Sequence, residues 1–438
     1  MYHKNRIESL YDLVTGDEDT RVCKDIPEEA CDDQPRNFFA YLTANVLNKI
    51  ADEIASAKLV LPWLMGMLGV PAAFTGFLVP IREAGVLIPQ LMVAAYIRHL
   101  AVRKWVWVVG ATLSAFSLLL MAFTALTLDG AMAGWAIIGA LVIFSLSRGI
   151  CSVSAKDVLG KTVSKSRRGN LMGMASGISG IATLGVGIVL GLLKDAAAGP
   201  VLVAGLILIA AGLWLPAIVS YILIKEQPGA TEGGGNGIQA ALAHLALLKT
   251  DAEFRHFVIA RTLLLSVALA PPFYVLLAQQ ESGGLADLGM LVIAGGLATS
   301  LSSPVWGRLG DRSARWVMVL ASIAAGELGM VTAALAYQDA PILAHGLTHA
   351  VLFLLLITAH SGVRLGRKVY LVDMATQETR AAMVAVSNTV IGVAMLAGGL
   401  IGFLGDRLGT AAIILILALA SFVAAGYAYS LREVSEPE

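Results

Sequence analysis

The chain has 438 residues, of which 57% are apolar and only 14% charged, and its mean hydropathy is +0.77. Soluble domains carry about 25% charged residues, so this composition excludes an ordinary soluble protein and predicts a multi-pass membrane protein. The 31 Lys and Arg residues balance the 31 Asp and Glu residues, and a neutral net charge argues against nucleic acid as a partner.

The first 36 residues are the most acidic part of the chain, with ten Asp and Glu against five Lys and Arg. We expect residues 1–36 to form a solvated cytoplasmic tail. The first half of the membrane domain then covers residues 37–224.

The first predicted helix, at residues 38–68, is unusually polar for a membrane span. Asn45, Asn48 and Asp52 recur every three to four residues and therefore share one face of a helix. Lys49 and Glu53 lie four residues apart on the adjacent stripe, a spacing at which the two side chains can pair. This face is the first candidate for a solute site.

The second predicted helix, at residues 71–97, carries Arg82 and Glu83 about ten residues from its start. At about 1.5 Å of rise per residue, these charges lie near the middle of the bilayer. Pro80 and Pro89 are expected to break or kink the helix. Charges at this depth must face one another or a water-filled cavity, because exposure to lipid costs too much.

Four further apolar segments complete the first half, at residues 105–126, 131–157, 170–193 and 201–224. The second of these carries Arg148 in its inner half. The third is rich in glycine, and Gly173 and Gly177 would allow a neighbouring helix to approach closely. The turns at residues 98–104 and 156–168 are basic, which predicts that they lie on the cytoplasmic side.

A glycine-rich stretch then marks the clearest boundary in the chain. We expect a cytoplasmic linker at residues 225–252, with a short amphipathic helix at 238–248, a second half at 253–432 and a tail at 433–438. Helix 7, at 254–278, contains Arg261 and a break at Pro271 and Pro272, and helix 9, at 316–337, carries Glu327 near mid-depth. Helices 10, 11 and 12 are predicted at residues 341–368, 383–404 and 409–431.

Residues 303–315, between helices 8 and 9, form a basic run that contains glycines and one carboxylate and cannot lie in hydrocarbon. We expect a tight cytoplasmic turn. Its residues Gly307, Gly310, Asp311, Arg312 and Arg315 resemble the G-x-L-x-D-R-x-x-R loop of the major facilitator superfamily. The corresponding loop of the first half, at residues 98–104, lacks the Asp.

The resemblance implies an all-α membrane protein with 12 transmembrane helices in two pseudo-symmetric six-helix bundles. Arg148 resembles the buried arginine of the family's fourth helix, which lies beside the cavity and influences proton exchange. Asp311 would cap the start of helix 5 and pair with Arg364 or Arg367 at the inner end of helix 10. This lock would form when the cytoplasmic side is closed. The Gly-Pro pair found in helix 5 of the family's drug antiporters is absent here.

Two regularities of the sequence agree with this organisation. Inner turns are rich in Lys and Arg and outer loops are poor in them, which predicts both termini in the cytoplasm of a bacterium and the chain in its inner membrane. Residues of the first half also recur in the second half at a constant separation in residue number, which we call the repeat displacement, as expected for two parallel units. This repeat displacement is the one that separates Lys156 from Lys368, Arg168 from Arg380, Gly180 from Gly392, and Gly187 from Gly399.

The sequence shows no nucleophile–base pair or metal-ligand cluster in an enzyme-like setting, so we expect neither an enzyme nor a bound metal or cofactor. A proton-coupled carrier needs a desolvated carboxylate beside a competing cation. Asp52, Glu53 and Glu327 are the candidates for proton coupling. The alternative is a permanent neutral cluster that only holds helices 1 and 2 together. The predicted substrate cavity comprises Asn45, Asn48, Lys49, Arg82, Glu83, Arg148 and Arg261.

Three functional hypotheses follow from the sequence. The first is a monomeric secondary transporter that moves a small polar or anionic organic solute, coupled to protons, by alternating access. The second is a proton-driven multidrug exporter. The third is a transporter-like sensor or scaffold that uses its acidic tail as an interaction surface.

Overall fold

The computed structural model describes residues 28–87, 99–192, 199–229, 245–376 and 379–434, with isolated positions 7, 8, 11, 14, 26, 93, 96, 97 and 231. Every element within these residues is an α-helix or a short 3-10 helix. Ten segments among them are long and apolar enough to cross a membrane. Most of the predicted tail at 1–36, Pro89 and most of the predicted amphipathic helix at 238–248 lie outside the described residues.

The long apolar helices lie close to the predicted segments. They are α7 (Lys104–Thr127), α8 (Gly130–Thr162), α9 (Lys165–Leu192), α10 (Pro200–Ile222), α16 (Leu285–Arg312), α17 (Ala314–Tyr337), α18 (Gly346–Met374), α19 (Arg380–Gly398) and α21 (Thr410–Tyr429). Shorter elements flank them: α2 (Glu28–Asp32), α12 (Leu247–Thr250), the 3-10 helices η1 (Pro341–Ala344) and η2 (Gly399–Ile401), and α20 (Gly402–Leu408).

The first predicted helix is not continuous, so that prediction was wrong. It divides into α3 (Gln34–Ile54) and α4 (Val60–Met67). Pro62 explains the break, because its ring would clash with the carbonyl of Lys58 in an uninterrupted helix and it has no N–H to donate. The chain turns instead at Ser56, whose carbonyl accepts a bond of 3.0 Å from the amide of Leu61. Lys58 therefore lies in an irregular segment inside the membrane domain.

Two other predicted breaks have different outcomes. Helix α5 (Ala72–Leu87) passes through Pro80 without interruption, so the helix does not break there and a kink stays a prediction. The seventh segment divides into α13 (Ala252–Leu263), α14 (Leu265–Leu269) and α15 (Pro271–Glu281). The break expected at Pro271 is confirmed, and a second one occurs at Leu264.

The basic run at residues 303–315 is mostly helical, so the predicted turn is wrong. Helix α16 continues to Arg312 and α17 begins at Ala314, which leaves only Ser313 between them. The side chain of Ser313 accepts a hydrogen bond of 3.1 Å from the amide of Trp316 and so caps α17. The charged residues therefore form a polar extension of α16, where their backbone groups are already hydrogen-bonded.

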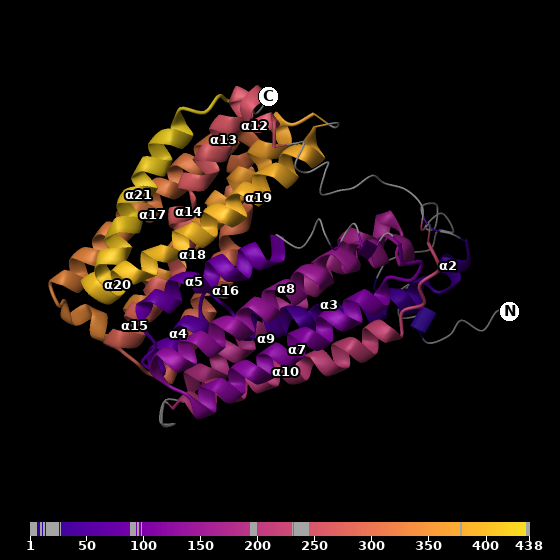
Figure 1. Cartoon of the computed structure of the whole chain (residues 1–438), viewed down its shortest axis with the longest axis horizontal. Coiled ribbons are helices and arrows are strands. Elements are labelled where there is room, and N and C mark those ends of the chain that lie inside the picture. The colour runs from indigo at the N-terminus through magenta and orange to yellow at the C-terminus, as the bar shows by residue number, and fades with distance from the viewer. Residues whose placement is uncertain are drawn as a thin grey trace.

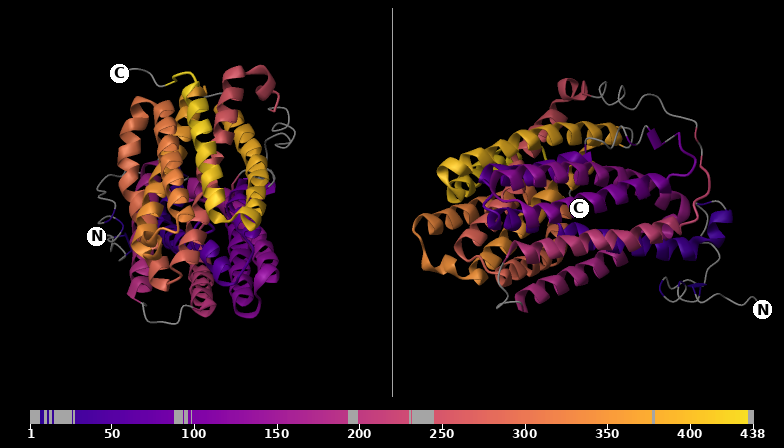
Figure 2. Two further views of the ribbon diagram at one scale, coloured as in Figure 1. Left: turned by 90° about the vertical axis from the view of Figure 1, so that its left-hand side faces the viewer. Right: turned by 60° about the horizontal axis from the view of Figure 1, so that its bottom comes forward.

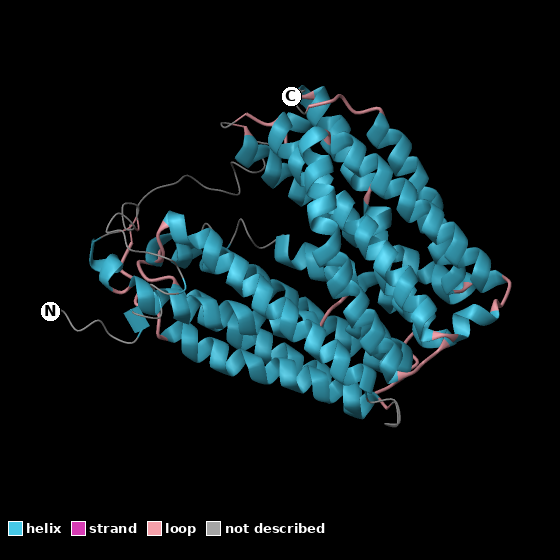
Figure 3. Ribbon diagram, turned by 180° about the vertical axis from the view of Figure 1, so that it is seen from behind, coloured by secondary structure: helices cyan, strands magenta, loops and turns pink. Residues whose placement is uncertain are grey.

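The helices form two groups (Figure 1). The first group comprises α3 to α10, coloured indigo to pink, and the second comprises α13 to α21, coloured orange to yellow. The groups meet at one end and diverge toward the end where both chain termini lie, as the view from behind also shows (Figure 3). Figure 2 shows the same helices from two further sides, in which the two groups overlap in projection. Contacts between the groups run through α5 with α19 and α20, α9 with α16, and α4 with α15.

Glycines form the closest approaches between the groups. A Cβ on Gly289 of α16 would lie 2.6 Å from the carbonyl oxygen of Gly187 and 2.5 Å from the amide nitrogen of Gly191, both on α9. A Cβ on Gly402 of α20 would lie 2.7 Å from the carbonyl oxygen of Ala73 on α5. Only glycine lets the backbones come this close. Both crossings lie at the end where the groups meet.

The internal repeat is present in the contacts as well as in the sequence. The guanidinium of Arg168 donates to the carbonyls of Val163 and Gly160. The guanidinium of Arg380 donates to the carbonyls of Ala375 and Val372, which are the same two positions shifted by the repeat displacement. The displacement therefore relates positions that have equivalent surroundings in the two groups.

Candidate functional site: a charged cluster between the two helical groups

Asp52, in the last turn of α3, is the centre of the polar cluster. Its Oδ2 accepts hydrogen bonds from Nε (3.1 Å) and Nη2 (2.7 Å) of Arg148 on α8. Its Oδ1 lies 3.5 Å from Nη2 of Arg82 on α5. Nη2 of Arg148 also donates to Oδ1 of Asn48, at 2.9 Å. Four predicted site residues are thus brought together, and one carboxylate faces two arginines.

Aromatic rings complete the surroundings of both arginines. The guanidinium of Arg148 lies 4.9 Å from the ring centre of Trp214 on α10, and that of Arg82 lies 5.3 Å from the ring of Phe144. Such cation–π contacts strengthen when water is excluded. The side chains of Asp52 and Arg148 are only 20% and 14% exposed. Loss of either partner would leave the other charge poorly solvated.

Lys58, in the break between α3 and α4, connects the two groups and was missed by the sequence analysis. Its Nζ lies 3.5 Å from Oε1 of Glu83 on α5 and 3.4 Å from Nε2 of His360 on α18. Pro62, four residues after Lys58, was the available signal, since it prevents a regular helix at that point. The structure therefore adds Lys58 and His360 to the candidate site.

Lys49 and Glu53 do not form the predicted ion pair. Nζ of Lys49 donates instead to the hydroxyl of Ser176 on α9, at 2.7 Å, while Asn45 donates to the sulfur of Met172 on the same helix. Glu53 is exposed, and no ion pair or hydrogen bond of its side chain occurs among the described residues. The charges that act on it include Lys58, Arg82 and Arg364.

The second group contributes cations without carboxylate partners. Arg261 of α13 donates to Oγ of Ser387 (2.6 Å) and Oδ1 of Asn388 (2.9 Å) on α19. Arg364 and Arg367 lie three residues apart on α18, and within the described residues neither is within 4 Å of an Asp or Glu oxygen. The two arginines act electrostatically on Glu53 and Glu83 of the first group, respectively.

The residues of the predicted gating motif are separate in this structure. Asp311 and Arg312 are exposed, and in the described part of the chain Asp311 has no ion-pair partner. Nε of Arg315 lies 3.3 Å from Oε2 of Glu433. Gly310 packs against Leu365, while Gly307 faces open space. The lock between Asp311 and Arg364 or Arg367 is therefore not formed in this conformation, and it stays a prediction.

Glu226 supplies the carboxylate that the first-half loop lacks. Its buried side chain accepts hydrogen bonds from the amides of Arg103 (2.9 Å) and Lys104 (2.7 Å) and from Nζ of Lys161 (3.1 Å). It thereby caps the start of α7, where a negative charge is stabilised by the helix dipole. Glu433 occupies a similar place in the second group, where it accepts from the hydroxyl of Ser313.

Glu327 lies apart from the cluster. Its side chain is exposed on α17, on the face that also exposes Leu320 and Val331. No partner of Glu327 occurs among the described residues.

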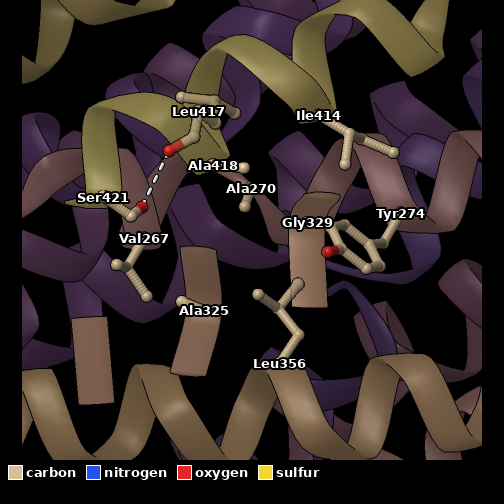
Figure 4. Close-up of a pocket in the computed structure, with 10 residues that line it drawn as sticks. All are labelled: Val267, Ala270, Tyr274, Ala325, Gly329, Leu356, Ile414, Leu417, Ala418 and Ser421. Atoms are coloured by element: carbon tan, nitrogen blue, oxygen red, sulfur yellow. Dashed lines mark hydrogen bonds between the residues drawn. The ribbon is translucent and has the colours of Figure 1, made fainter. Parts of the chain in front are cut away.

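A small cavity lies inside the second group, away from these charges. Figure 4 shows its lining, in which Tyr274 of α15 and Ser421 of α21 are the only side chains with oxygen. Ser421 donates to the carbonyl of Leu417 at 2.7 Å. The remaining side chains are apolar, so this cavity offers nothing that would recognise a charged solute.

Long apolar helices that enclose ion pairs define a multi-pass membrane protein with a polar interior. Residues 257–438 match the family model described as Major Facilitator Superfamily. No curated protein matches the sequence. This family model matches the second helical group, and the likeness of the first group rests on the shared fold described next.

Several solved transporters are similar in fold. A POT family transporter in complex with 5-aminolevulinic acid has a TM-score of 0.68 at 13% identity, over 92% of this chain and 98% of that chain. The nucleoside transporter NupG has 0.63 at 15%, over 90% and 98%. The inward open xylose transporter XylE from E. coli has 0.61 at 14%, over 90% and 96%. Identities this low show the fold and leave the substrate open.

Proposed function

We propose that the chain is a secondary transporter that moves a small polar or anionic organic solute by alternating access, coupled to protons. In this proposal 12 membrane helices form two six-helix bundles, at residues 37–224 and 253–432. The observation that carries it is the placement of charges between the groups. Glu53, Arg364 and Arg367 have no ion-pair partner within 4 Å among the described residues, yet they lie on helices of a membrane domain. Such charges are tolerated where water and a solute reach them.

Asp52 and Glu53 are adjacent in the chain and have different surroundings. Asp52 is held by two arginines, Arg148 and Arg82. Glu53 has no such bond among the described residues and lies beside the competing cations Lys58, Arg82 and Arg364, so we expect it to bind and release a proton as the cluster rearranges. We therefore assign proton coupling to Glu53 and assign Asp52 the role of holding α3, α5 and α8 together.

The conformation supports the access mechanism. The groups are closed by glycine crossings at one end and diverge at the end of the termini (Figure 1). With both termini in the cytoplasm of a bacterial inner membrane, as the basic turns predict, this is an inward-facing state. Asp311 has no ion-pair partner among the described residues in this state, which agrees with a lock that forms only when the inner side closes.

The charged lining disfavours the multidrug hypothesis, since an amphipathic drug would have to displace water from several unpaired arginines. The scaffold hypothesis depends on the acidic tail, which lies mostly outside the described residues. Neither alternative has an observation of its own in its favour.

The test is transport by purified protein in proteoliposomes, with a solute first found by a thermal-shift screen of small organic acids at two pH values. A pH gradient should drive accumulation by the wild type. Glu53→Gln should abolish accumulation and keep solute exchange, because the exchange step needs no proton transfer. Glu253→Gln, at an exposed surface pair with Arg432, is the matched control. Accumulation by Glu53→Gln equal to the wild type would reject the coupling role, and absence of any solute movement would reject the transporter.

A further inference from the structure

The cations Lys49 and Arg261 occupy equivalent positions in the two helical groups. They are separated by the repeat displacement, the same one that relates the contacts of Arg168 to those of Arg380. Lys49 lies on α3 and Arg261 on α13, the first long helix of each group. The pair was not among the repeats found in the sequence, because Lys and Arg are different residues.

Their hydrogen-bond partners are equivalent as well. Lys49 donates to Ser176 on α9 at 2.7 Å. Arg261 donates to Asn388 on α19 at 2.9 Å, and the repeat displacement carries Ser176 onto Asn388. Two cations and two neutral acceptors thus form the same arrangement twice. The symmetry extends to how each side chain is held as well as to its charge.

The rest of the polar face of α3 is not repeated. The repeat displacement carries Asn45, Asn48, Asp52 and Glu53 onto Phe257, Ala260, Leu264 and Leu265. The cation is therefore the only one of these five polar positions that is polar in both groups. A purely structural salt-bridge network would have carboxylates beside the cations in both groups. In the second group the positions equivalent to Asp52 and Glu53 are apolar.

Neither cation forms a close ion pair in the described part of the chain, although Glu53 acts electrostatically on Lys49. Within the described residues, no Asp or Glu oxygen lies within 4 Å of Lys49 or Arg261, and their acceptors are hydroxyl and amide oxygens. Nε of Arg261 is buried and lacks a hydrogen-bond partner. Arg367, a further cation, adds positive electrostatic potential at Arg261. Two positive sites, one on each group, therefore lack a contacting anion among the described residues.

We propose that Lys49 and Arg261 bind the two acidic groups of one small organic dianion, one on each side of the pseudo-two-fold axis. This inference rests on the proposed transport function and adds its substrate class. A solute held this way touches both helical groups at once, so its binding links their movements. Ser176 and Asn388 hold the cations in place through the hydrogen bonds seen here.

The test uses the full-length protein in lipid nanodiscs and two probe series. One series is dicarboxylates of three to six carbons, and the other is phosphorylated hydroxy acids. Each probe is compared with an analogue of the same length that has one acidic group replaced by a neutral amide or hydroxyl. Binding is measured by calorimetry. We expect at least one diacid to bind about tenfold or more tightly than its one-charge analogue, as a lost charged contact implies.

Lys49→Gln and Arg261→Gln should each weaken diacid binding about tenfold or more and remove the preference over the one-charge analogue. Lys49→Arg and Arg261→Lys keep the charge and should keep the preference, which separates a binding role from loss of folding. Arg432→Gln, at a surface cation, should change nothing. Equal binding of diacids and their analogues, or an unchanged preference in Arg261→Gln, would overturn the proposal. Proton-driven transport of a neutral or singly charged solute would overturn it while leaving the transporter function intact.

Discussion

The glycine crossing between α9 and α16 predicts how a single methyl group would change the conformational equilibrium. In Gly289→Ala, the new Cβ would lie 2.5 Å from the amide nitrogen of Gly191 and 2.6 Å from the carbonyl oxygen of Gly187. Both contacts are with backbone, which cannot rotate away as a side chain can. The helices would have to separate by about 1 Å to restore ordinary contact, and such overpacking costs about 1–3 kcal/mol.

The helix itself gains about 1 kcal/mol when alanine replaces glycine. Gly180→Ala, on α9 where no atom lies within 4 Å of the added Cβ, receives this gain without the clash and is the matched control. The helix gain is the same in both conformations, whereas the penalty of about 1–3 kcal/mol applies only to the conformation in which the crossing is closed. Gly289→Ala should therefore shift the equilibrium about fivefold to about 150-fold away from the present state.

Spin labels at the exposed positions Lys156 and Arg308, near the end of the termini, provide the measurement in nanodiscs. Opening of the crossing should close that end, so Gly289→Ala should increase the population of short distances and Gly180→Ala should not. If both variants keep the wild-type distance distribution, the crossing does not close one end of the protein as argued here.

Two further predictions concern stability, measured by thermal unfolding in detergent. Asp52→Ala leaves Arg148 and Arg82 poorly solvated and should lower the free energy of unfolding by about 3 kcal/mol. The Asp52→Ala, Arg148→Ala double variant should lose clearly less stability than the sum of the two single losses. Strict additivity would mean that the pair is uncoupled. Glu226→Ala removes the cap of α7 and should lower the free energy of unfolding by about 1–2 kcal/mol. The control Glu253→Ala, at an exposed surface pair, should lower it by less than about 1 kcal/mol. Equal losses in the two variants would contradict the capping role.

The sequence predicted the helices well where apolar length alone defines them, as in α7, α10 and α21. It failed at Lys58, because the break depends on a proline that follows it inside an apolar run. It also failed at residues 303–312, where charge suggested a turn. Charge shows that a segment leaves the hydrocarbon, but a helix can leave it without ending, since its backbone groups are satisfied internally.

The sequence predicted which residues form the candidate site better than it predicted which residues contact one another. The polar face of α3 was recognised from its spacing, yet its residues divide between two neighbours: Asn48 and Asp52 contact α8, while Asn45 and Lys49 contact α9. These partners are distant along the chain, and helical periodicity carries no information about which neighbour a side chain meets. Glu226 was missed for the same reason, because its role as a cap depends on where the chain returns after α10.

The distribution of charge between the groups implies competition between the protein and its solute. Glu53 and Glu83 lie on the first group, whereas α18 has no Asp or Glu before Asp373. In the proposed closure of the end of the termini, Arg364 and Arg367 would approach these two carboxylates. An ion pair at about 4 Å is worth about 4 kcal/mol at an effective dielectric constant of about 20, before desolvation is subtracted. The empty protein can therefore neutralise its own cations by closing, and a bound anion would take the place of these carboxylates. Protonation of Glu53 removes one of the negative charges that compete with the solute for the cations. This gives a physical route by which a proton and an anionic solute would bind together.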